Sequence, residues 1–378
     1  MTPGSSTKPG HLYHEPAFPT DRPFQRGRNQ ERLDILLAHE DWFSKHVVDW
    51  GCSAGYFTMK LAQAGATVYG FDADPQAIAF ARQQALEHGV KKADFNIHDF
   101  GGRYFHVELD PEVMLALSVI PWLIKTEPNH WQIIRELFAA PTAYVELMYA
   151  GDGRAGMAEV RNDEEAQVWL EQFYPTVYPI GMTMPDHNGD IPRTIWRCTR
   201  LTRPSMAEDE AEADFTGAQA FVWLRGAYAL KRGRPGRAYD PLREEKALRA
   251  LEGHYVAPRA LQAAQEGLLM TRLYGRTLHD IVLKGEGPPL TGEQVDKLAE
   301  GFEEICQALE RTKVRHRDVR PENIMVTPGG VPYLLDFGWA TIGDEELEVP
   351  EGINPEHRAD TDRGSFKSIL RVLYETLE

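Results

Sequence analysis

The chain has 378 residues, with 41 Lys and Arg against 57 Asp and Glu, which gives a formal net charge of -16. At about 100 to 200 residues per domain, this length predicts two or three domains. The negative charge argues against a non-specific nucleic-acid binder, whose affinity depends on clustered positive charge. A hydrophobic content of 42% and an aromatic content of 10% exclude a largely disordered, collagenous or coiled-coil chain.

The cysteines and the apolar runs bear on the compartment. Cys52, Cys198 and Cys306 are far apart and show neither C-x-x-C nor metal-ligand spacing, which favours a reducing cytosol. The longest apolar run, residues 113–124, is shorter than the roughly 20 residues that cross a bilayer. The N-terminus lacks the apolar core of a secretory signal. We therefore expect a cytoplasmic location and no membrane-spanning segment.

A change of composition divides the chain. Residues 203–214 are rich in acidic side chains and contain Pro204, which indicates an interdomain linker. Before it, residues 1–202 alternate strand-like and helical patterns, as in an α/β domain with a parallel sheet covered on both faces. After it, in residues 215–378, strands come first and helices follow, which predicts a second domain of the α+β type.

The first domain contains a glycine turn. The short apolar run His46–Asp49 is followed by Gly51 and Gly55 and then by a helical pattern over Tyr56–Ala64. Glycines let a backbone approach a ligand closely, and the N-terminus of the next helix offers unpaired N–H groups. About 20 residues on, the second strand ends at Asp72, a residue type that accepts hydrogen bonds from ribose hydroxyls. Turns of this kind also occur for structural reasons alone.

The order D-x-G-C-x-x-G-x-F and then L-A-x-x-G-A-x-V-x-G-x-D resembles class I S-adenosylmethionine-dependent methyltransferases rather than dinucleotide enzymes. The resemblance covers about residues 11–201 and implies a Rossmann-like parallel sheet. It implies that the cofactor S-adenosylmethionine is held at its methionine end by Asp49, Gly51 and Gly55, at its ribose by Asp72, and at its adenine by Asp99 and Phe100. Trp122, after the expected fourth strand, is either a wall of the acceptor pocket or a core residue.

The second domain carries the most specific motifs in the sequence. Residues 316–323 read H-R-D-V-R-P-E-N and residues 335–338 read L-D-F-G, which match the catalytic loop and the D-F-G turn of protein-kinase-like folds. Phosphoryl transfer needs a carboxylate near the attacking hydroxyl and side chains that hold magnesium against the triphosphate. We assign Asp318 as the base, Asn323 and Asp336 as Mg²⁺ ligands, and Arg320 as a contact of the transferred phosphoryl group.

Other segments complete the expected ATP site. Lys231 ends a strand-like run that resembles the one carrying the phosphate-binding lysine, and Glu244, or alternatively Glu245, is its expected partner from the following helix, Leu242–Leu251. The hinge that meets adenine is expected at residues 268–275, with Met270 and Leu273. Residues 216–222 retain only one glycine of the usual phosphate-covering loop, which predicts modest ATP affinity. A helix is expected from Asp362, and without the later large-lobe helices a peptide substrate is not favoured.

The order of the domains resembles the bifunctional kinase-methyltransferases of the WbdD type, which terminate bacterial O-antigen polysaccharides. Residues 12–14 and 29–34 are similar to that family's opening Tyr and Q-R-L-D helix. The resemblance implies that Tyr13 and Arg32 join the S-adenosylmethionine site. In that family, recruitment to the inner membrane face and the glycan polymerase partner depend on a C-terminal region that is absent from this sequence. Membrane recruitment is therefore not carried over, and the expected location stays cytoplasmic.

The resemblance implies a two-step reaction: a kinase phosphorylates a terminal hydroxyl of a saccharide, and the methyltransferase then methylates the new phosphate. Arg193 and His187 are candidates for orienting that phosphate. Two alternatives stay open, namely a tailoring enzyme that acts on a small-molecule hydroxyl and a methyltransferase regulated by a pseudokinase domain.

Overall fold

The computed structural model describes residues 12–14, 16–19, 24–26, 29–98, 109–127, 130–151, 156–157, 159–183, 192–206, 212–285, 290–345 and 361–376. The chain divides into two units, the first comprising Met1–Leu36 and Asp41–Thr202 and the second Leu37–Glu40 and Arg203–Glu378. Each unit has its own sheets and its own buried apolar core.

The elements of the first part of the chain follow one another in the order β1 (Leu12–His14), β2 (Phe24–Arg26), α1 (Asn29–His39), β3 (His46–Trp50), α2 (Tyr56–Gln63), β4 (Thr67–Asp72), α3 (Pro75–Glu87), β5 (Ala93–Ile97), β6 (Val113–Leu117), α4 (Ile120–Thr126), α5 (His130–Leu137), β7 (Thr142–Glu146), α6 (Asp163–Glu171), β8 (Thr176–Thr183) and β9 (Arg193–Thr199).

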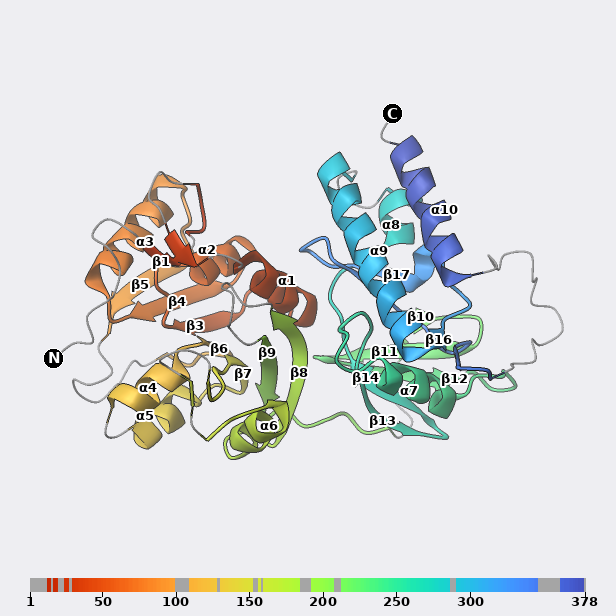
Figure 1. Ribbon diagram of the computed structural model, residues 1–378, viewed down its shortest axis with the longest axis horizontal. Helices are drawn as coiled ribbons and strands as arrows, with labels where there is room; N and C mark the ends of the chain where they lie inside the picture. Colours follow the sequence, from red (N-terminus) through yellow and green to blue (C-terminus); the bar gives the residue numbers. More distant parts are fainter. Residues whose placement is uncertain are drawn as a thin grey trace. The chain divides into compact units, whose positions relative to one another are not determined.

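One sheet organises the first unit, with the strand order β5-β4-β3-β6-β7-β9-β8. All neighbours from β5 to β7 are parallel, and β9 runs antiparallel to both β7 and β8. Helices α2 and α3 lie on one side of the sheet and α4, α5 and α6 on the other (Figure 1). The strand order reverses between β3 and β6, and in open α/β sheets ligands bind at the carboxyl ends of the strands beside such a reversal.

Local sequence explains the central elements of this unit. β6 is apolar throughout and its first four residues are buried, as expected of a strand covered on both faces. α3 begins with Pro75 after Asp74, whose side chain accepts hydrogen bonds from the backbone N–H groups of Gln76 and Ala77. The expectation of a Rossmann-like sheet is confirmed, with the antiparallel β9 as an addition to it.

The elements of the second part of the chain are β10 (Phe215–Thr216), β11 (Ala220–Arg225), β12 (Tyr228–Gly233), α7 (Pro241–Ala250), β13 (Ala260–Ala264), β14 (Gly267–Thr271), β15 (Arg276–Thr277), α8 (Leu278–Val282), α9 (Gly292–Thr312), β16 (Val314–Arg315), the 3-10 helix η1 (Pro321–Asn323), β17 (Ile324–Val326), β18 (Pro332–Leu334), β19 (Thr341–Ile342) and α10 (Asp362–Glu375).

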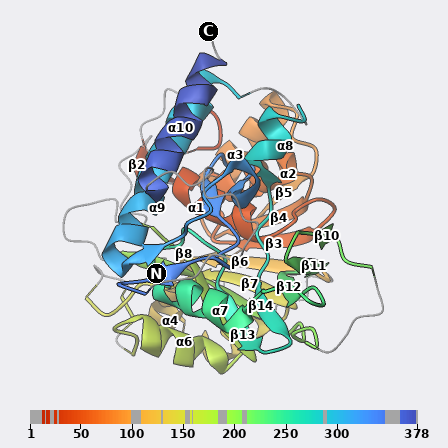
Figure 2. The ribbon, with the colours of Figure 1, turned by 90° about the vertical axis from the view of Figure 1, so that its right-hand side faces the viewer.

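The second unit has an antiparallel sheet followed by a helical part. The sheet has the order β10-β11-β12-β14-β13, and α7 packs against it. In the helical part, α10 lies along α9, where the rings of Phe302 and Phe366 are 4.7 Å apart (Figure 2). This arrangement confirms the expected α+β protein-kinase-like fold.

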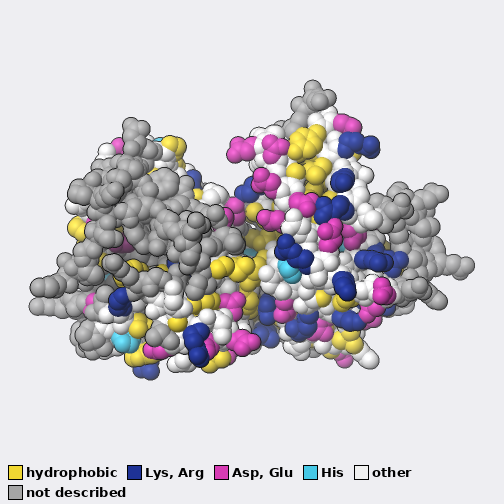
Figure 3. Space-filling view, in the orientation of Figure 1, with side chains coloured by type: hydrophobic (Ala, Val, Ile, Leu, Met, Phe, Trp, Pro, Cys, Tyr) yellow, Lys and Arg dark blue, Asp and Glu magenta, His cyan; other side chains and the backbone are white. Residues whose placement is uncertain are grey.

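The second unit carries both acidic and basic side chains on its surface. On the face drawn in Figure 3, acidic and basic side chains of the second unit are interspersed rather than gathered into a basic patch. Within the described residues, no helix is both long and apolar enough to span a bilayer.

Candidate active sites

The glycine turn follows β3 at its carboxyl end. Gly51 and Gly55 have φ angles of 73° and 80°, a region that favours glycine, and Gly55 N–H closes the turn on the carbonyl of Cys52 at 2.8 Å. A Cβ on Gly51 would lie 3.0 Å from Val119, and one on Gly55 would lie 2.5 Å from the ring of Phe95. The positive φ angles and these close contacts therefore favour glycine at both positions, independently of any cofactor.

Asp72 ends β4 beside this turn. Its two carboxylate oxygens accept hydrogen bonds from the backbone N–H groups of Ser53, at 2.8 Å, and Asp74, at 2.9 Å. Burial raises the pKa of Asp72, while those two N–H groups act in the opposite direction. Because a carboxylate oxygen has two lone pairs, the side chain keeps capacity for ribose hydroxyls.

Asp49, in β3, is buried and accepts a hydrogen bond of 2.7 Å from the hydroxyl of Thr58 on α2. Burial raises the pKa of Asp49 to about 6. A cationic group such as the ammonium of a bound amino acid would favour the ionised carboxylate. The carboxylate acceptors at this edge thus fit the ammonium group at the methionine end and the ribose hydroxyls of S-adenosylmethionine.

Helix α1 approaches the same turn. Gln30 accepts a hydrogen bond of 2.9 Å from the hydroxyl of Tyr56, the first residue of α2. The guanidinium of Arg32 is paired with the buried Glu146, with Nε 2.8 Å from Oε2. Tyr13 lies in β1, whose side chains fall outside the described part of the structure, as do Asp99, Phe100 and His187.

The burial of Arg193 and Trp122 bears on the roles expected for these two residues. Arg193 begins β9 and is buried, so it is not a solvated surface residue. Its Nη1 lies 3.3 Å from the hydroxyl of Ser118 and 3.6 Å from Oε1 of Glu146. Trp122, on α4, is 39% exposed and therefore is not a core residue.

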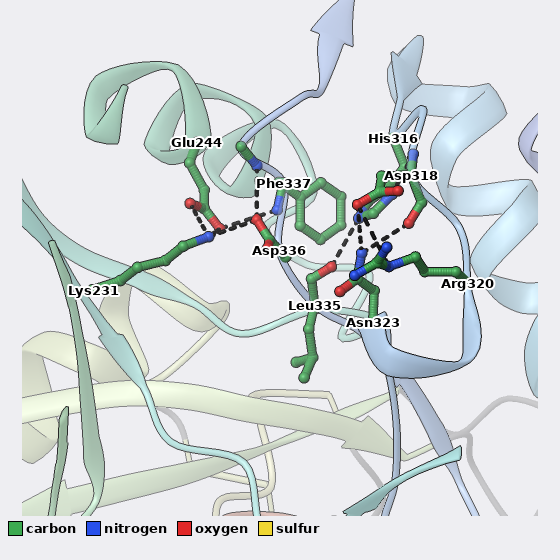
Figure 4. A network of polar contacts seen from close by, with 10 residues as sticks. Lys231, Glu244, His316, Asp318, Arg320, Asn323, Leu335, Asp336 and Phe337 are labelled. Carbon is green, nitrogen blue, oxygen red and sulfur yellow. Dashed lines mark hydrogen bonds and ion pairs between the residues drawn. The ribbon is translucent and has the colours of Figure 1, made fainter. Parts of the chain in front are cut away.

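In the second unit, the buried Lys231 is the centre of a charged network (Figure 4). Its Nζ lies 2.7 Å from Oε2 of Glu244 on α7 and 2.6 Å from Oδ1 of Asp336. Burial alone would lower the pKa of Lys231, but Asp336 and Glu244 together raise it above its usual value. Glu245 points to Arg249 instead, with an ion pair of 2.8 Å, so the first of the two expected partners is the one brought to Lys231.

The catalytic-loop residues lie on the other side of Asp336 (Figure 4). The side-chain amide of Asn323 donates to Oδ2 and to the backbone carbonyl of Asp318, both at 2.9 Å. Burial raises the pKa of Asp318, and Arg320, whose Nε lies 3.9 Å from Oδ2, opposes this. A carboxylate with a raised pKa is better suited to accept a proton.

Backbone contacts hold this loop in place. Asp362, at the start of α10, accepts hydrogen bonds from the N–H groups of His316 and Arg317 at 2.7 and 2.9 Å. The His316 ring contacts the Leu335 carbonyl at 2.8 Å. Asp336 and Arg317 adopt φ angles of 61° and 67°, uncommon values for residues other than glycine.

The remaining predicted contacts lie around the antiparallel sheet. Met270, on β14, and Leu273, which follows it, are both buried. The loop with one glycine is a tight turn between β10 and β11, closed by the N–H of Gly217 on the carbonyl of Ala220 at 2.9 Å.

The residues present fit a magnesium site of the kinase type. No group of three or more His, Cys, Asp or Glu side chains forms a metal cluster within the part of the chain that the structure describes. Mg²⁺ is usually held by one or two carboxylates together with substrate phosphates and water, which is the donor set that Asp336 and Asn323 would complete.

Sequence reasoning missed two polar residues, Glu146 and Tyr239, and the contact of a third, Asp362, with the catalytic loop. Glu146 closes β7 as an acid after an apolar run, the same signal that identified Asp49 and Asp72. Tyr239 places its ring 4.9 Å from the Nζ of Lys231, and Asp362 supports the catalytic loop. The last two contacts join segments without a local pattern that would reveal them.

A family model described as "Methyltransferase domain" matches residues 44–107. The O-antigen chain terminator bifunctional methyltransferase/kinase WbdD of Escherichia coli is 24% identical over 85% of this chain and 50% of its own length. The serine/threonine-protein kinase AfsK of Streptomyces coelicolor is 31% identical over 32% of this chain and 16% of its own length. A crystal structure of WbdD, 19% identical, covers 97% of this chain and 93% of the solved chain with a TM-score of 0.44.

The chain spans about half the length of the two curated WbdD relatives that it matches. That similarity extends over most of this chain rather than over one of its units. The chain is therefore homologous to the WbdD-type bifunctional methyltransferase/kinases, with a methyltransferase domain ahead of a kinase-like domain.

Proposed function

We propose that this protein phosphorylates a terminal hydroxyl with ATP and then methylates the new phosphate with S-adenosylmethionine. The acceptor we propose is the end of a bacterial surface polysaccharide, whose growth the modification terminates. The proposal rests on the homology to O-antigen chain terminators along most of the chain. We assign ATP, Mg²⁺ and S-adenosylmethionine as the substrates and cofactors of the two sites.

The observation that carries the kinase half is the network of Lys231, Glu244 and Asp336. Lys231 lies within 3.0 Å of both oxygens of Glu244, so the cation is held where it would meet the triphosphate. A regulatory pseudokinase has no need of this arrangement together with Asp318 and Asn323. We therefore favour an active kinase over the pseudokinase alternative.

In the proposed phosphoryl transfer, the oxygen of the attacking hydroxyl bonds to the γ-phosphorus of ATP while the bond from that phosphorus to ADP breaks and ADP leaves. Asp318 accepts the proton of the hydroxyl. Asn323 and Asp336 would hold Mg²⁺, which supplies positive charge against the phosphates when it is bound. Arg320, with its side chain 57% exposed, is free of the core and is proposed to contact the transferred phosphoryl group.

The second step needs little help from a base. A phosphomonoester carries at least one negative charge near neutral pH, with a second pKa of about 6, so its oxygen is already a nucleophile. The methyltransferase domain then has to orient that oxygen in line with the sulfur–methyl bond, so that the methyl group passes to the oxygen and S-adenosylhomocysteine leaves.

The test separates the two steps with one variant. Asp318→Ala should neither phosphorylate nor methylate an acceptor that ends in a hydroxyl, but it should methylate the same acceptor after chemical phosphorylation. Products are read by mass. If Asp318→Ala methylates the hydroxyl-ended acceptor as wild type does, the proposed order of reactions is wrong.

A further inference from the structure

A buried polar cluster lies at the carboxyl ends of β6 and β7, next to the glycine turn. Ser118 directly follows β6, and the next residue, Val119, is the side chain that a Cβ on Gly51 would meet at 3.0 Å. Ser118 has a φ of 63° and donates its backbone N–H to the carbonyl of Glu146 at 3.0 Å. This cluster therefore borders the turn that we assign to S-adenosylmethionine.

Both oxygens of Glu146 are engaged in this cluster. Oε1 accepts from the hydroxyl of Ser118 and lies 3.3 Å from Nη2 of Arg32 and 3.6 Å from Nη1 of Arg193. Oε2 accepts from Nε of Arg32 at 2.8 Å and from the hydroxyl of Thr183 at 3.3 Å. Glu146 has no exposed surface, and the two arginines are 6 to 7% exposed.

The two arginines are held in different ways. Arg32 makes two hydrogen bonds to the carboxylate, a fork geometry that fixes a guanidinium in place. Nη1 of Arg193 is farther from the carboxylate than a hydrogen bond allows, and this nitrogen donates to Ser118 instead. An anionic ligand can therefore replace the Ser118 contact without breaking a hydrogen bond between Nη1 and Glu146.

The charges of this cluster suit an anion better than a neutral hydroxyl. Methylation of a hydroxyl needs a base that removes its proton. Burial alone would raise the pKa of Glu146, but Arg32 and Arg193 hold it below its usual value. An ionised carboxylate with these partners is a weak base, whereas two neighbouring guanidiniums are suited to a phosphate.

We propose that Arg193 binds an anionic methyl acceptor, and that Glu146 and Ser118 are the positioning residues that hold its guanidinium at the edge of the sheet. The inference rests on the proposed function, because it names the residues with which the methyltransferase domain would select a phosphomonoester. It adds a prediction of its own, which is selection of the acceptor by charge.

The experiment measures methyl transfer from S-adenosylmethionine to a synthetic disaccharide with a phosphomonoester at its non-reducing end. Arg193→Ala should raise the KM for this acceptor by at least about tenfold, the effect of losing one charge-assisted hydrogen bond. The Kd for S-adenosylmethionine, measured by calorimetry, should stay within about twofold, since cofactor binding is assigned to other residues. Ser118→Ala should raise the same KM with a smaller effect.

A pH profile distinguishes contact with the anion from a structural role. In wild type, the KM should rise as the pH falls below about 6, because the acceptor loses its second charge. This dependence should be flatter in Arg193→Ala. The control is Arg161→Ala, which removes an arginine of the same unit that pairs with Glu165 and is 73% exposed. It should leave both the KM and the pH profile unchanged.

The role of Glu146 is tested by combining a substitution of Glu146 with Arg193→Ala. Glu146→Gln should raise the acceptor KM in wild type and add little to the rise already present in Arg193→Ala, because both changes remove the same contact. If Glu146→Gln does not fold, because it leaves buried cations without their counter-ion, the Arg193 and Ser118 variants still decide the proposal.

The outcomes distinguish a failure of this inference from a failure of the proposed function. An unchanged acceptor KM in Arg193→Ala, with phosphomonoester methylation intact, overturns the inference and leaves the proposed function standing. Methylation of the hydroxyl-ended disaccharide but not of its phosphomonoester by wild type contradicts both. Wild type that binds S-adenosylmethionine and methylates neither probe also counts against both.

Discussion

Asp336 joins the two halves of the kinase-like site. Its Oδ1 lies 2.6 Å from the Nζ of Lys231. The neighbouring ammonium of Lys231 lowers the pKa of Asp336 below its usual value, so the side chain is ionised at neutral pH. An ionised carboxylate in this position is suited to hold Mg²⁺.

We expect Asp336→Ala to reduce ATP turnover by about a thousandfold or more, because the metal loses its carboxylate ligand. S-adenosylmethionine binding should not change, since the glycine turn belongs to the other unit. Turnover is measured as ADP release, with Asp296→Ala as the matched control, because Asp296 is exposed on α9. Wild-type turnover in Asp336→Ala would show that the metal assignment is wrong.

Asp49 gives the methyltransferase domain a pH dependence. Because burial raises the pKa of Asp49 to about 6, the carboxylate is ionised above that pH and protonated below it. In the free protein, this raised pKa means that stability from Asp49 is greatest at low pH and is lost as the pH rises through about 6. A bound ammonium group reverses the preference, because it pairs with the ionised form.

We therefore expect S-adenosylmethionine affinity to fall by up to about tenfold for each pH unit below the pKa of Asp49. Calorimetry between about pH 5 and pH 8 measures this. Asp49→Asn should bind more weakly and show a flat profile over the same range. If wild type also shows a flat profile, Asp49 does not contact the cofactor's charged end.

At the scale of elements, the glycine turn shows how packing and ligand binding constrain the same residues. A Cβ on Gly55 would lie 2.5 Å from the Phe95 ring and 3.1 Å from Ala81, so α2, α3 and β5 meet at this point. Gly89 also has a positive φ, but nothing lies within 4 Å of its Cβ position.

Substitution of these two glycines separates the effect of the contact with Phe95 on stability from the effect of the positive φ angle. Gly89→Ala should lower stability by about 1 kcal/mol, the cost of a positive φ alone. Gly55→Ala should cost about 1 to 3 kcal/mol more, because Phe95 has to move. The midpoints of thermal unfolding test this. Equal shifts for the two variants would mean that the Phe95 ring yields without cost.

The sequence predicted the elements that have strong local patterns. The helix expected over Tyr56–Ala64 is α2, Tyr56–Gln63, and the strand expected to end at Asp72 is β4, Thr67–Asp72. Both segments have a periodic pattern of apolar residues and are followed by residues typical of a turn. The antiparallel course of β9 could not be read in this way, because strand direction depends on partners far along the chain.

The same limit applies to the candidate sites. The catalytic-loop and D-F-G motifs made Asp318, Asn323 and Asp336 candidates because the spacing of these motifs is itself the signal. The pairing of Arg32 with Glu146 joins residues 114 positions apart. An apolar pattern shows which face of an element is buried, but it does not show which buried charges meet.

At the scale of the whole molecule, the proposed function requires that the two activities of one chain are coupled. The homology to WbdD-type proteins spans both units, and each unit has its own core. If a phosphate made by the second unit is the methyl acceptor of the first, methylation of a hydroxyl-ended acceptor requires ATP. Two independent tailoring activities would show no such requirement.

Methyl incorporation from S-adenosylmethionine into an unphosphorylated acceptor, with and without Mg²⁺ and ATP, tests this coupling most directly. The account predicts incorporation only when ATP is present, with phosphate and methyl found on the same product by mass. Equal incorporation in the absence of ATP would contradict it, because the methyl group would then be transferred to a hydroxyl without a preceding phosphorylation.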